Sequence, residues 1–286
     1  MAAESHVKSA ERVLEIFETL AGTPRGLNFT ALQQSLGIPK SSLHALLDVL
    51  TARGYLELDP ATRAYTVGLR LWESSQAYQR HHGLVSEALP VMEQIVTVIN
   101  ETTQLAVLDG LENVYLAKVD SSHPLRLQSE VGKRLPAYAT GLGKTLLAHL
   151  DDADLALRLR DAPLRAYTPT TIIEVNALTA ELRRLRRRGF GIDNQEYTPG
   201  LCCVAVPITD HYGQCVAAIS ISVPLTRASL DMLSEGLAQL AEGSIQIARR
   251  LGAQRDDVRL LALRDHVAAR KELLSLGQAP ALGLSG

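Results

Sequence analysis

The segment 27–55, LNFTALQQSLGIPKSSLHALLDVLTARGY, contains two short helical patterns separated by a tight turn. Asn28 can cap the first helix, and Gly37 can end it because glycine adopts the left-handed conformation at little cost. Pro39 can open the second helix, where its missing N–H leaves no hydrogen bond unmade. The segment is therefore predicted to form a helix-turn-helix.

The second of these helices has one apolar face and one polar face. The apolar face is made of leucines at helical spacing, namely Leu43, Leu46, Leu47 and Leu50. Its exposed face begins with short polar side chains, and in a helix-turn-helix that end of the second helix enters the DNA major groove. An ordinary corner between two helices, with no nucleic acid, fits the same residues, so both interpretations remain open at this point.

Two short extended runs follow the second helix directly, between Tyr55 and Val67. They flank an Asp-Pro turn that also carries an arginine. Such a hairpin, or wing, can lie along the DNA backbone beside the recognition helix, so the combination favours a winged DNA-binding module. The candidate DNA-binding residues are Lys40, Ser41, Ser42, His44 and Arg63.

The length and composition indicate a globular protein with two domains. The chain has 286 residues, of which 46% are hydrophobic and 21% charged, and it has no apolar run long enough to cross a membrane. Its N-terminal residues lack the basic and apolar segments of a signal peptide, so a cytoplasmic protein is expected. The three cysteines have neither the paired spacing of a zinc site nor a disulfide pattern.

The charge of the winged module is too low for tight DNA binding by one copy. Residues 1–67 contain six Lys or Arg against seven Asp or Glu, and the whole chain has a formal net charge of −2. Because DNA affinity depends on neutralising phosphates, we expect several modules to bind one operator together. A homodimer or a dimer of dimers is therefore predicted, with the helix Gly68–His82 as the contact and its Leu69 and Trp72 covering apolar surface.

The rest of the chain predicts an α+β domain, because extended and helical patterns are mixed along it. The expected strands are Gln104–Asp109, Asn113–Val119, Phe190–Tyr197, Cys202–Ile208 and Cys215–Val223. The expected helices are Leu84–Thr103, 142–160, Glu174–Arg188 and Arg227–Leu251. The segment boundaries that follow are 1–67 for the winged module, 68–83 for a linker helix, 84–252 for the α+β domain and 253–286 for an extension. This extension begins helical and ends in QAPALGLSG, which is expected to be disordered.

Two motifs suggest other functions but are incomplete or have an ordinary explanation. The segment 141–145 ends like a phosphate-binding loop, but Tyr138 stands where the first glycine would be needed. The arginine-rich run 183–188 lies at the end of a predicted helix, where cations complement the helix dipole. The eight histidines lie in no catalytic or metal-binding context, so no catalytic residue, metal or cofactor is predicted.

Several blocks of the sequence, in order, resemble the IclR family of bacterial transcriptional regulators over residues 5–252. These blocks are IPKSSLHALLDVLTARGYLELD (38–59), LPAYATGLGKTLLAHL (135–150), AYTPTTI (166–172), RRGFGIDNQEYTPGLCCVAVPI (187–208) and AAISISVP (217–224). The resemblance implies an N-terminal winged helix, a linker helix and a GAF-like domain that binds a small organic effector, commonly a carboxylate. It also implies dimers, or dimers of dimers, on a double-stranded DNA operator.

The resemblance also implies an effector site. The matching positions are Gly141, Leu142, Asp193, Cys203, Ser220 and Ser222. Two departures from the family pattern are Val223, where a glycine is common, and Ala45, where many members have arginine. A site of this kind has too few cations for a phosphate, so the expected effector has one carboxylate and a hydroxyl or carbonyl, between apolar walls from Leu135, Tyr138 and Leu142.

The function expected from the sequence is thus that of a sequence-specific transcriptional repressor or activator that responds to a small organic acid, without catalysis. Two alternatives remain: an enzyme that acts on a small acid in the α+β domain, and a winged module that only contacts other proteins.

Overall fold

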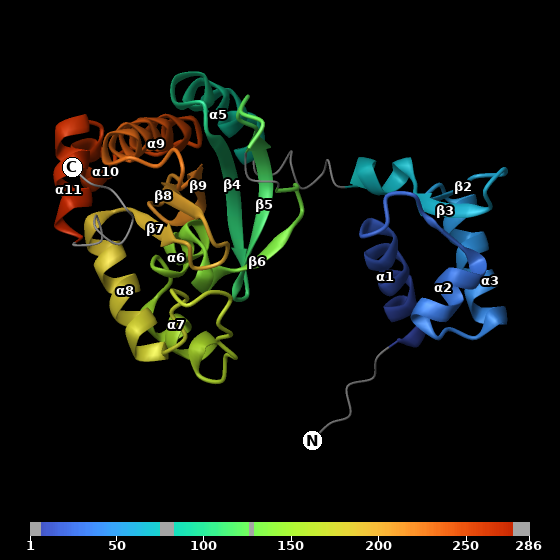
Figure 1. Ribbon diagram of the computed structural model, residues 1–286. Coiled ribbons are helices and arrows are strands. Elements are labelled where there is room, and N and C mark those ends of the chain that lie inside the picture. Colours follow the sequence, from blue (N-terminus) through green and yellow to red (C-terminus); the bar gives the residue numbers. More distant parts are fainter. Residues whose placement is uncertain (1–6, 75–82, 126–128, 277–286) are drawn as a thin grey trace. The chain divides into compact units, whose positions relative to one another are not determined.

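The computed structural model of the chain describes residues 7–74, 83–125 and 129–276 (Figure 1). The chain divides into two compact units, Met1–His82 and Gly83–Gly286. In the described parts of both units, no helix is long and apolar enough to span a membrane.

The first unit is a three-helix bundle with a small sheet. Its elements are α1 (Lys8–Ala21), β1 (Leu27–Asn28), α2 (Phe29–Leu36), α3 (Lys40–Ala52), β2 (Leu56–Leu58) and β3 (Ala64–Val67). The strands pair in the order β1-β3-β2, so the hairpin β2–β3 is the predicted wing. The first unit is therefore a winged helix-turn-helix.

The turn between α2 and α3 forms as the sequence predicts. The Asn28 side chain accepts a hydrogen bond from the backbone N–H of Ala31 at 2.9 Å, which caps α2. Gly37 ends α2 with a φ of 63°, in the left-handed region that favours glycine. Because Leu43 and Leu47 are buried against Leu32, α2 holds α3 with its polar face outward.

A helix follows the wing at 69–74. It corresponds to the start of the predicted linker helix, and the remainder of that prediction, up to residue 82, lies outside the described residues. Leu69 and Trp72 are both mostly exposed on this helix, at 61% and 60%.

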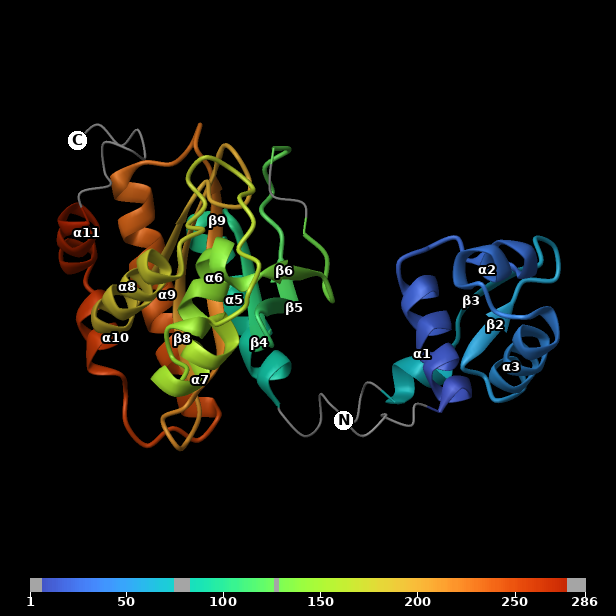
Figure 2. The same cartoon turned by 90° about the horizontal axis from the view of Figure 1, so that it is seen from below.

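The second unit is a six-stranded antiparallel sheet with helices on both faces (Figures 1 and 2). Its strands are β4 (Thr102–Asp109), β5 (Glu112–Val119), β6 (Arg134–Pro136), β7 (Gly191–Asn194), β8 (Leu201–Thr209) and β9 (Cys215–Pro224). They pair in the order β6-β5-β4-β9-β8-β7. The helices are α5 (Leu84–Ile99), η1 (Ala137–Ala139), α6 (Gly141–Leu147), α7 (Asp152–Leu159), α8 (Val175–Arg188), α9 (Leu230–Arg250), α10 (Val258–Leu263) and α11 (His266–Ser275).

Alternate side chains of β8 and β9 pack into two different hydrophobic clusters, one on each face of the sheet. Val204 and Ile221 point to the face covered by α5 and α9, where the larger hydrophobic cluster lies. Ala205 and Ala218 point to the opposite face, where they pack with Leu142 and Leu146 of α6. This period of two is the geometry of a strand buried on both faces. The face covered by α6 is the one that contains the candidate site.

Parts of the second unit differ from the sequence expectations. The helix expected over Leu84–Thr103 ends at Ile99, before β4 begins at Thr102. The single helix expected over 142–160 is two helices, α6 and α7, because the chain turns at 148–151. The short edge strand β6 was not expected. The extension after residue 252, which was expected to begin helical, forms α10 and α11, and its Leu260, Leu263 and Leu273 are buried in the core beside α9. The tail that was expected to be disordered lies outside the described residues.

Candidate functional site

The polar end of α3 is the candidate DNA-contacting surface. Lys40, Ser41 and His44 are exposed, and Ser42 is half-buried. The Nδ1 atom of His44 lies 2.8 Å from a carboxylate oxygen of Asp48, one helical turn further on. This contact directs the imidazole toward Asp48 and places a carboxylate on the same exposed face.

The wing has a rigid tip that displays Arg63. The Asp59 carboxylate accepts hydrogen bonds from the backbone N–H groups of Thr62 and Ala61, at 3.1 and 2.7 Å, and these bonds lower the pKa of Asp59. Arg63 follows with a φ of 56°, and its side chain is exposed. Within the described residues no acceptor for its guanidinium is found, so this cation is available to a phosphate.

The second unit contains a cavity of about 220 Å³ between α6 and the sheet. The residues that line it come from several separate segments of the chain: Tyr115, Ser129, Lys133, Leu135, Thr140, Gly141, Leu142, Asp193, Tyr197, Thr198, Leu201, Cys203, Ser220 and Ser222. The structure thus brings all six residues of the expected effector site to one cavity. Tyr138, expected as an apolar wall, does not line it.

Strand register explains why these side chains converge. Asp193 of β7 is paired with Cys203 of β8, and Cys203 is paired with Ser222 of β9. Directly opposed residues on neighbouring strands point to the same face, so the three side chains form a row across the sheet. Ser220 lies two residues before Ser222 and shares that face.

The two serine hydroxyls are held by a residue that the sequence analysis missed. Ser220 and Ser222 donate hydrogen bonds to the Oε1 atom of Gln104 at 3.2 and 2.9 Å. The Nε2 atom of Gln104 in turn donates to the hydroxyl of Ser129 at 3.3 Å. Gln104 is itself 1% exposed. The signal that could have revealed it was a glutamine followed directly by the apolar residues Leu105 to Leu108 in a predicted strand, because a buried amide needs hydrogen-bond partners.

Unpaired backbone N–H groups lie on the opposite wall, at Gly141 and Leu142. Thr140 closes the neighbouring turn, because its hydroxyl accepts from Gly143 at 3.0 Å and donates to Asn113 at 2.8 Å. In the part of the chain that the structure describes, the N–H groups of Gly141 and Leu142 have no acceptor. They are therefore donors that a ligand in the cavity can use.

The pKa of the Asp193 carboxyl group is raised toward neutral pH. It is 3% exposed, and this burial, followed by the nearby charge of Glu196, raises the pKa of Asp193 to about 7. One of its oxygens accepts a hydrogen bond from the backbone N–H of Glu196 at 2.7 Å. Near pH 7 the group is therefore present in both forms, and the protonated form can donate to a ligand.

Lys144 cannot serve a phosphate, although it belongs to the segment that resembles a phosphate-binding loop. Its side chain is 2% exposed, and its ammonium pairs with the Glu196 carboxylate. The Lys144–Glu196 pair connects α6 to the segment after β7, and the ammonium of Lys144 is already paired with a carboxylate.

The position of Tyr138 corrects the sequence expectation. Its hydroxyl donates to the Arg165 carbonyl at 3.0 Å and accepts from the Arg165 N–H at 2.8 Å. These two bonds hold the ring in a separate hydrophobic cluster with α7 and α8. Tyr115 and Tyr197, which were not expected, contribute aromatic surface to the cavity instead.

The cysteines of the second unit are neutral thiols. Burial raises the pKa of Cys203 well above its usual value, and the Sγ atom lies 3.2 Å from the Ser222 hydroxyl. Cys203 is thus a weak hydrogen-bonding group rather than a nucleophile. No cluster of three or more His, Cys, Asp or Glu side chains suited to a metal occurs among the described residues.

A winged helix-turn-helix followed by a separate α+β domain defines a DNA-binding transcriptional regulator. Two family models match this chain. Residues 9–60 match the IclR helix-turn-helix domain, and residues 76–249 match the model described as bacterial transcriptional regulator IclR C-terminal. The chain therefore belongs to the IclR family of transcriptional regulators, as its sequence predicts.

Curated relatives and solved structures agree with this assignment. The regulator BhcR of Paracoccus denitrificans is 34% identical over 86% of both chains, and KdgR of Escherichia coli is 32% identical over 85% of this chain and 94% of its own. The crystal structure of Thermotoga maritima IclR has a TM-score of 0.72 at 28% identity and covers 86% of this chain and all of its own. An IclR homologue from Microbacterium hydrocarbonoxydans, solved with 4-hydroxybenzoate, has a TM-score of 0.78 at 27% identity over 85% of this chain and 98% of its own. These relatives are transcriptional regulators, not enzymes.

Proposed function

We propose that a small organic acid binds in the cavity of the second unit and changes the affinity of the protein for its DNA operator. The observation that carries this proposal is the convergence of hydroxyls, unpaired N–H groups and a titratable carboxyl on one cavity of about 220 Å³. Pockets for drug-sized ligands span roughly 300–1,000 Å³, so this cavity suits a smaller molecule. The complex of the Microbacterium homologue with 4-hydroxybenzoate supports an acid of this kind.

The carboxylate of the effector would accept hydrogen bonds from the N–H groups of Gly141 and Leu142. Backbone N–H groups in a concave turn bind anions without the cost of ordering side chains. Ser220 and Ser222 would complete this contact, and protonated Asp193 would donate to a hydroxyl or carbonyl oxygen of the effector. A nearby Cys203 and the aromatic rings would limit its size.

The DNA contacts would come from α3 and the wing. Ser41, Ser42 and His44 would approach base edges in the major groove, while Lys40 and Arg63 would contact phosphates. Since the winged unit carries no net positive charge, two or more copies would bind together. The exposed Leu69 and Trp72 are the proposed contact between those copies.

The experiment that tests the effector site measures operator binding and ligand binding together. The DNA upstream of the chain's own coding region is titrated by fluorescence anisotropy, with and without members of a panel of short keto, hydroxy and aromatic acids. The same acids are titrated by calorimetry. At least one acid is expected to bind and to change the operator affinity.

Variants locate the site. Ser222→Ala removes one buried hydrogen-bond partner, which costs about 1–3 kcal/mol and corresponds to roughly tenfold weaker ligand binding. Ser234→Ala is the matched control, because Ser234 is equally buried but bonds to Leu230 within its own helix. If the double variant Asp193→Ala, Ser222→Ala bound the effector as the wild type does, the site would lie elsewhere.

A further inference from the structure

Two of the side chains that line the cavity are charged, and one of them is a lysine that the sequence analysis did not consider. Asp193 lies deep in the cavity, at 3% exposure, whereas Lys133 is exposed and lies at its mouth. Lysine keeps its ammonium near water while its aliphatic stem covers apolar surface. The cavity therefore has a cation at its outer end.

Strand pairing aims Lys133 at the cavity. The Lys133 carbonyl accepts a hydrogen bond from the backbone N–H of Tyr115 at 3.1 Å, and the Tyr115 carbonyl accepts one from Gly132 at 2.8 Å. The chain therefore bulges just before β6, and Tyr115 lies opposite both Gly132 and Lys133. Lys133 and Tyr115 are thus opposite each other, and cross-strand neighbours point to the same face. Because Tyr115 is buried and lines the cavity, Lys133 lies on the cavity side of β6.

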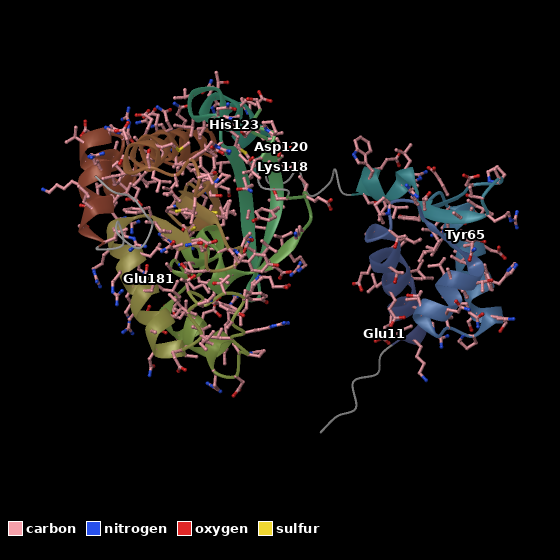
Figure 3. The ribbon with its side chains drawn as sticks, viewed as in Figure 1. Glu11, Tyr65, Lys118, Asp120, His123 and Glu181 are labelled. Atoms are coloured by element: carbon pink, nitrogen blue, oxygen red, sulfur yellow. The ribbon has the colours of Figure 1, made fainter. Side chains whose placement is uncertain are left out.

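Other cations of β5 and β6, the strands beside Lys133, are already paired with carboxylates. Arg134 points away from Lys133 and binds the carboxylates of Asp109 and Glu112 at 2.6 and 2.7 Å. Lys118, near the end of β5, lies 3.1 Å from Asp120 (Figure 3). For Lys133 no carboxylate is found among the described residues.

The two anion-binding positions differ in depth. The N–H groups of Gly141 and Leu142 and the hydroxyls of Ser220 and Ser222 are buried, at the inner end of the cavity. A carboxylate bound there lies within the protein, while the Lys133 ammonium remains at the mouth. A molecule that uses both positions needs an anionic group at each end.

We propose that Lys133 determines the specificity of the pocket by pairing with a second anionic group, so that the effector is a short dicarboxylic acid. The inference rests on the proposed function, because it assumes that the first carboxylate binds the inner N–H groups and serines. It extends that function by naming the chemical class of the effector. The mouth of the pocket would then distinguish a dicarboxylic acid from a monocarboxylic acid, which the inner groups cannot do.

The test compares dicarboxylic acids with their monoamides, which have nearly the same shape and one fewer charge. Succinate, glutarate and malate are titrated by calorimetry against the monoamide of each, at low and high salt. The best-bound diacid is expected to bind roughly threefold to tenfold more tightly than its monoamide, as for a partly solvated ion pair. High salt should reduce this preference.

Lys133→Gln should remove the preference, and Lys133→Arg should keep most of it. Arg134→Gln is the matched control, because it removes an adjacent cation that points away from the cavity, and it should leave the preference unchanged. Equal binding of diacid and monoamide by the wild type, or a preference that survives in Lys133→Gln, overturns the inference. In that case binding of a monocarboxylic acid at the inner site leaves the proposed function standing, whereas no binding of any acid overturns both.

Discussion

The Ser222 hydroxyl donates a hydrogen bond to the Oε1 atom of Gln104, 2.9 Å away on the neighbouring strand. A serine hydroxyl has only one proton, so in this arrangement it cannot also donate to a carboxylate. Rotation of the Gln104 amide by half a turn would let Nε2 donate to the serine oxygens, and the serine O–H groups could then donate to a ligand. The orientation of the Gln104 amide thus sets whether the serines can donate hydrogen bonds to the effector.

Replacement of Gln104 by glutamate should block this adjustment. A glutamate carboxylate only accepts hydrogen bonds, so the serines would continue to donate to it, and its charge would repel an acidic effector. Gln104→Glu is expected to weaken effector binding by at least about tenfold in calorimetry. Gln254→Glu, an exposed site in the same unit, adds the same charge and should have no effect. Unchanged binding by Gln104→Glu would show that the serines do not contact the acid.

Effector binding should depend on pH through Asp193. The pKa of Asp193 is raised to about 7 by burial, so the protonated form that can donate to the effector is dominant below pH 7 and is lost as the pH rises above it. The affinity for an acid is therefore expected to fall between about pH 6 and 8. Asp193→Asn, which cannot lose a proton, should flatten this dependence. Calorimetry in buffers of different ionisation enthalpy should detect proton uptake by the wild type only, and equal proton uptake by both proteins would contradict the role of Asp193.

Arg63 should contribute to DNA affinity without contributing to sequence preference. Arg63→Ala removes one phosphate contact, so binding to all sequences should weaken alike and the slope of log affinity against log salt should decrease by about one unit. His44→Ala should instead alter the preferred bases. Arg160→Ala, an exposed cation of the second unit, is the control for the lost charge. An unaltered salt slope in Arg63→Ala would mean that the wing does not touch DNA.

The C-terminal helices should stabilise the second unit through their buried side chains. Leu273 is 4% exposed and packs in the core with α9, while the next residue, Leu274, is 49% exposed. Leu273→Ala is expected to lower the free energy of unfolding by about 2–5 kcal/mol. Leu274→Ala, with the same change in composition, should cost less than about 1 kcal/mol. Urea unfolding of both variants compares them directly, and equal stability would show that α11 is not part of the cooperative core.

Local sequence patterns predicted the elements whose signals lie within a short stretch of the chain. The helix-turn-helix followed from the sequence alone, because its signals are the cap at Asn28, the helix end at Gly37 and the spacing of the leucines in α3. The period of two in a strand likewise places Ser220 and Ser222, which are two residues apart in β9, on one face of the sheet. A capping residue or a strand period is visible without knowledge of the fold.

The contents of the cavity could not be predicted in the same way, because they depend on contacts between distant segments. Gln104 meets Ser222 only because β4 pairs with β9, and Lys133 meets Tyr115 only because a short edge strand forms. Tyr138 was expected as an apolar wall of the pocket, yet its hydrogen bonds to Arg165 hold it in another cluster. Strand order and edge pairing are tertiary properties that no local pattern contains.

The extension beyond the family-matched region is joined through α8 to α6, the helix that lines the pocket. The Arg259 guanidinium donates to the carbonyl of Arg186 at the end of α8, and Arg186 donates to the carbonyl of Ala148 at the end of α6. Helices α6, α8 and α10 are thus connected end to end by guanidinium–carbonyl hydrogen bonds. Contiguous parts of a protein often open as one cooperative unit in hydrogen exchange, and we expect these three helices to belong to one such unit. Occupation of the pocket at Gly141 should therefore slow amide exchange as far away as α10, in a part of the chain that touches no ligand.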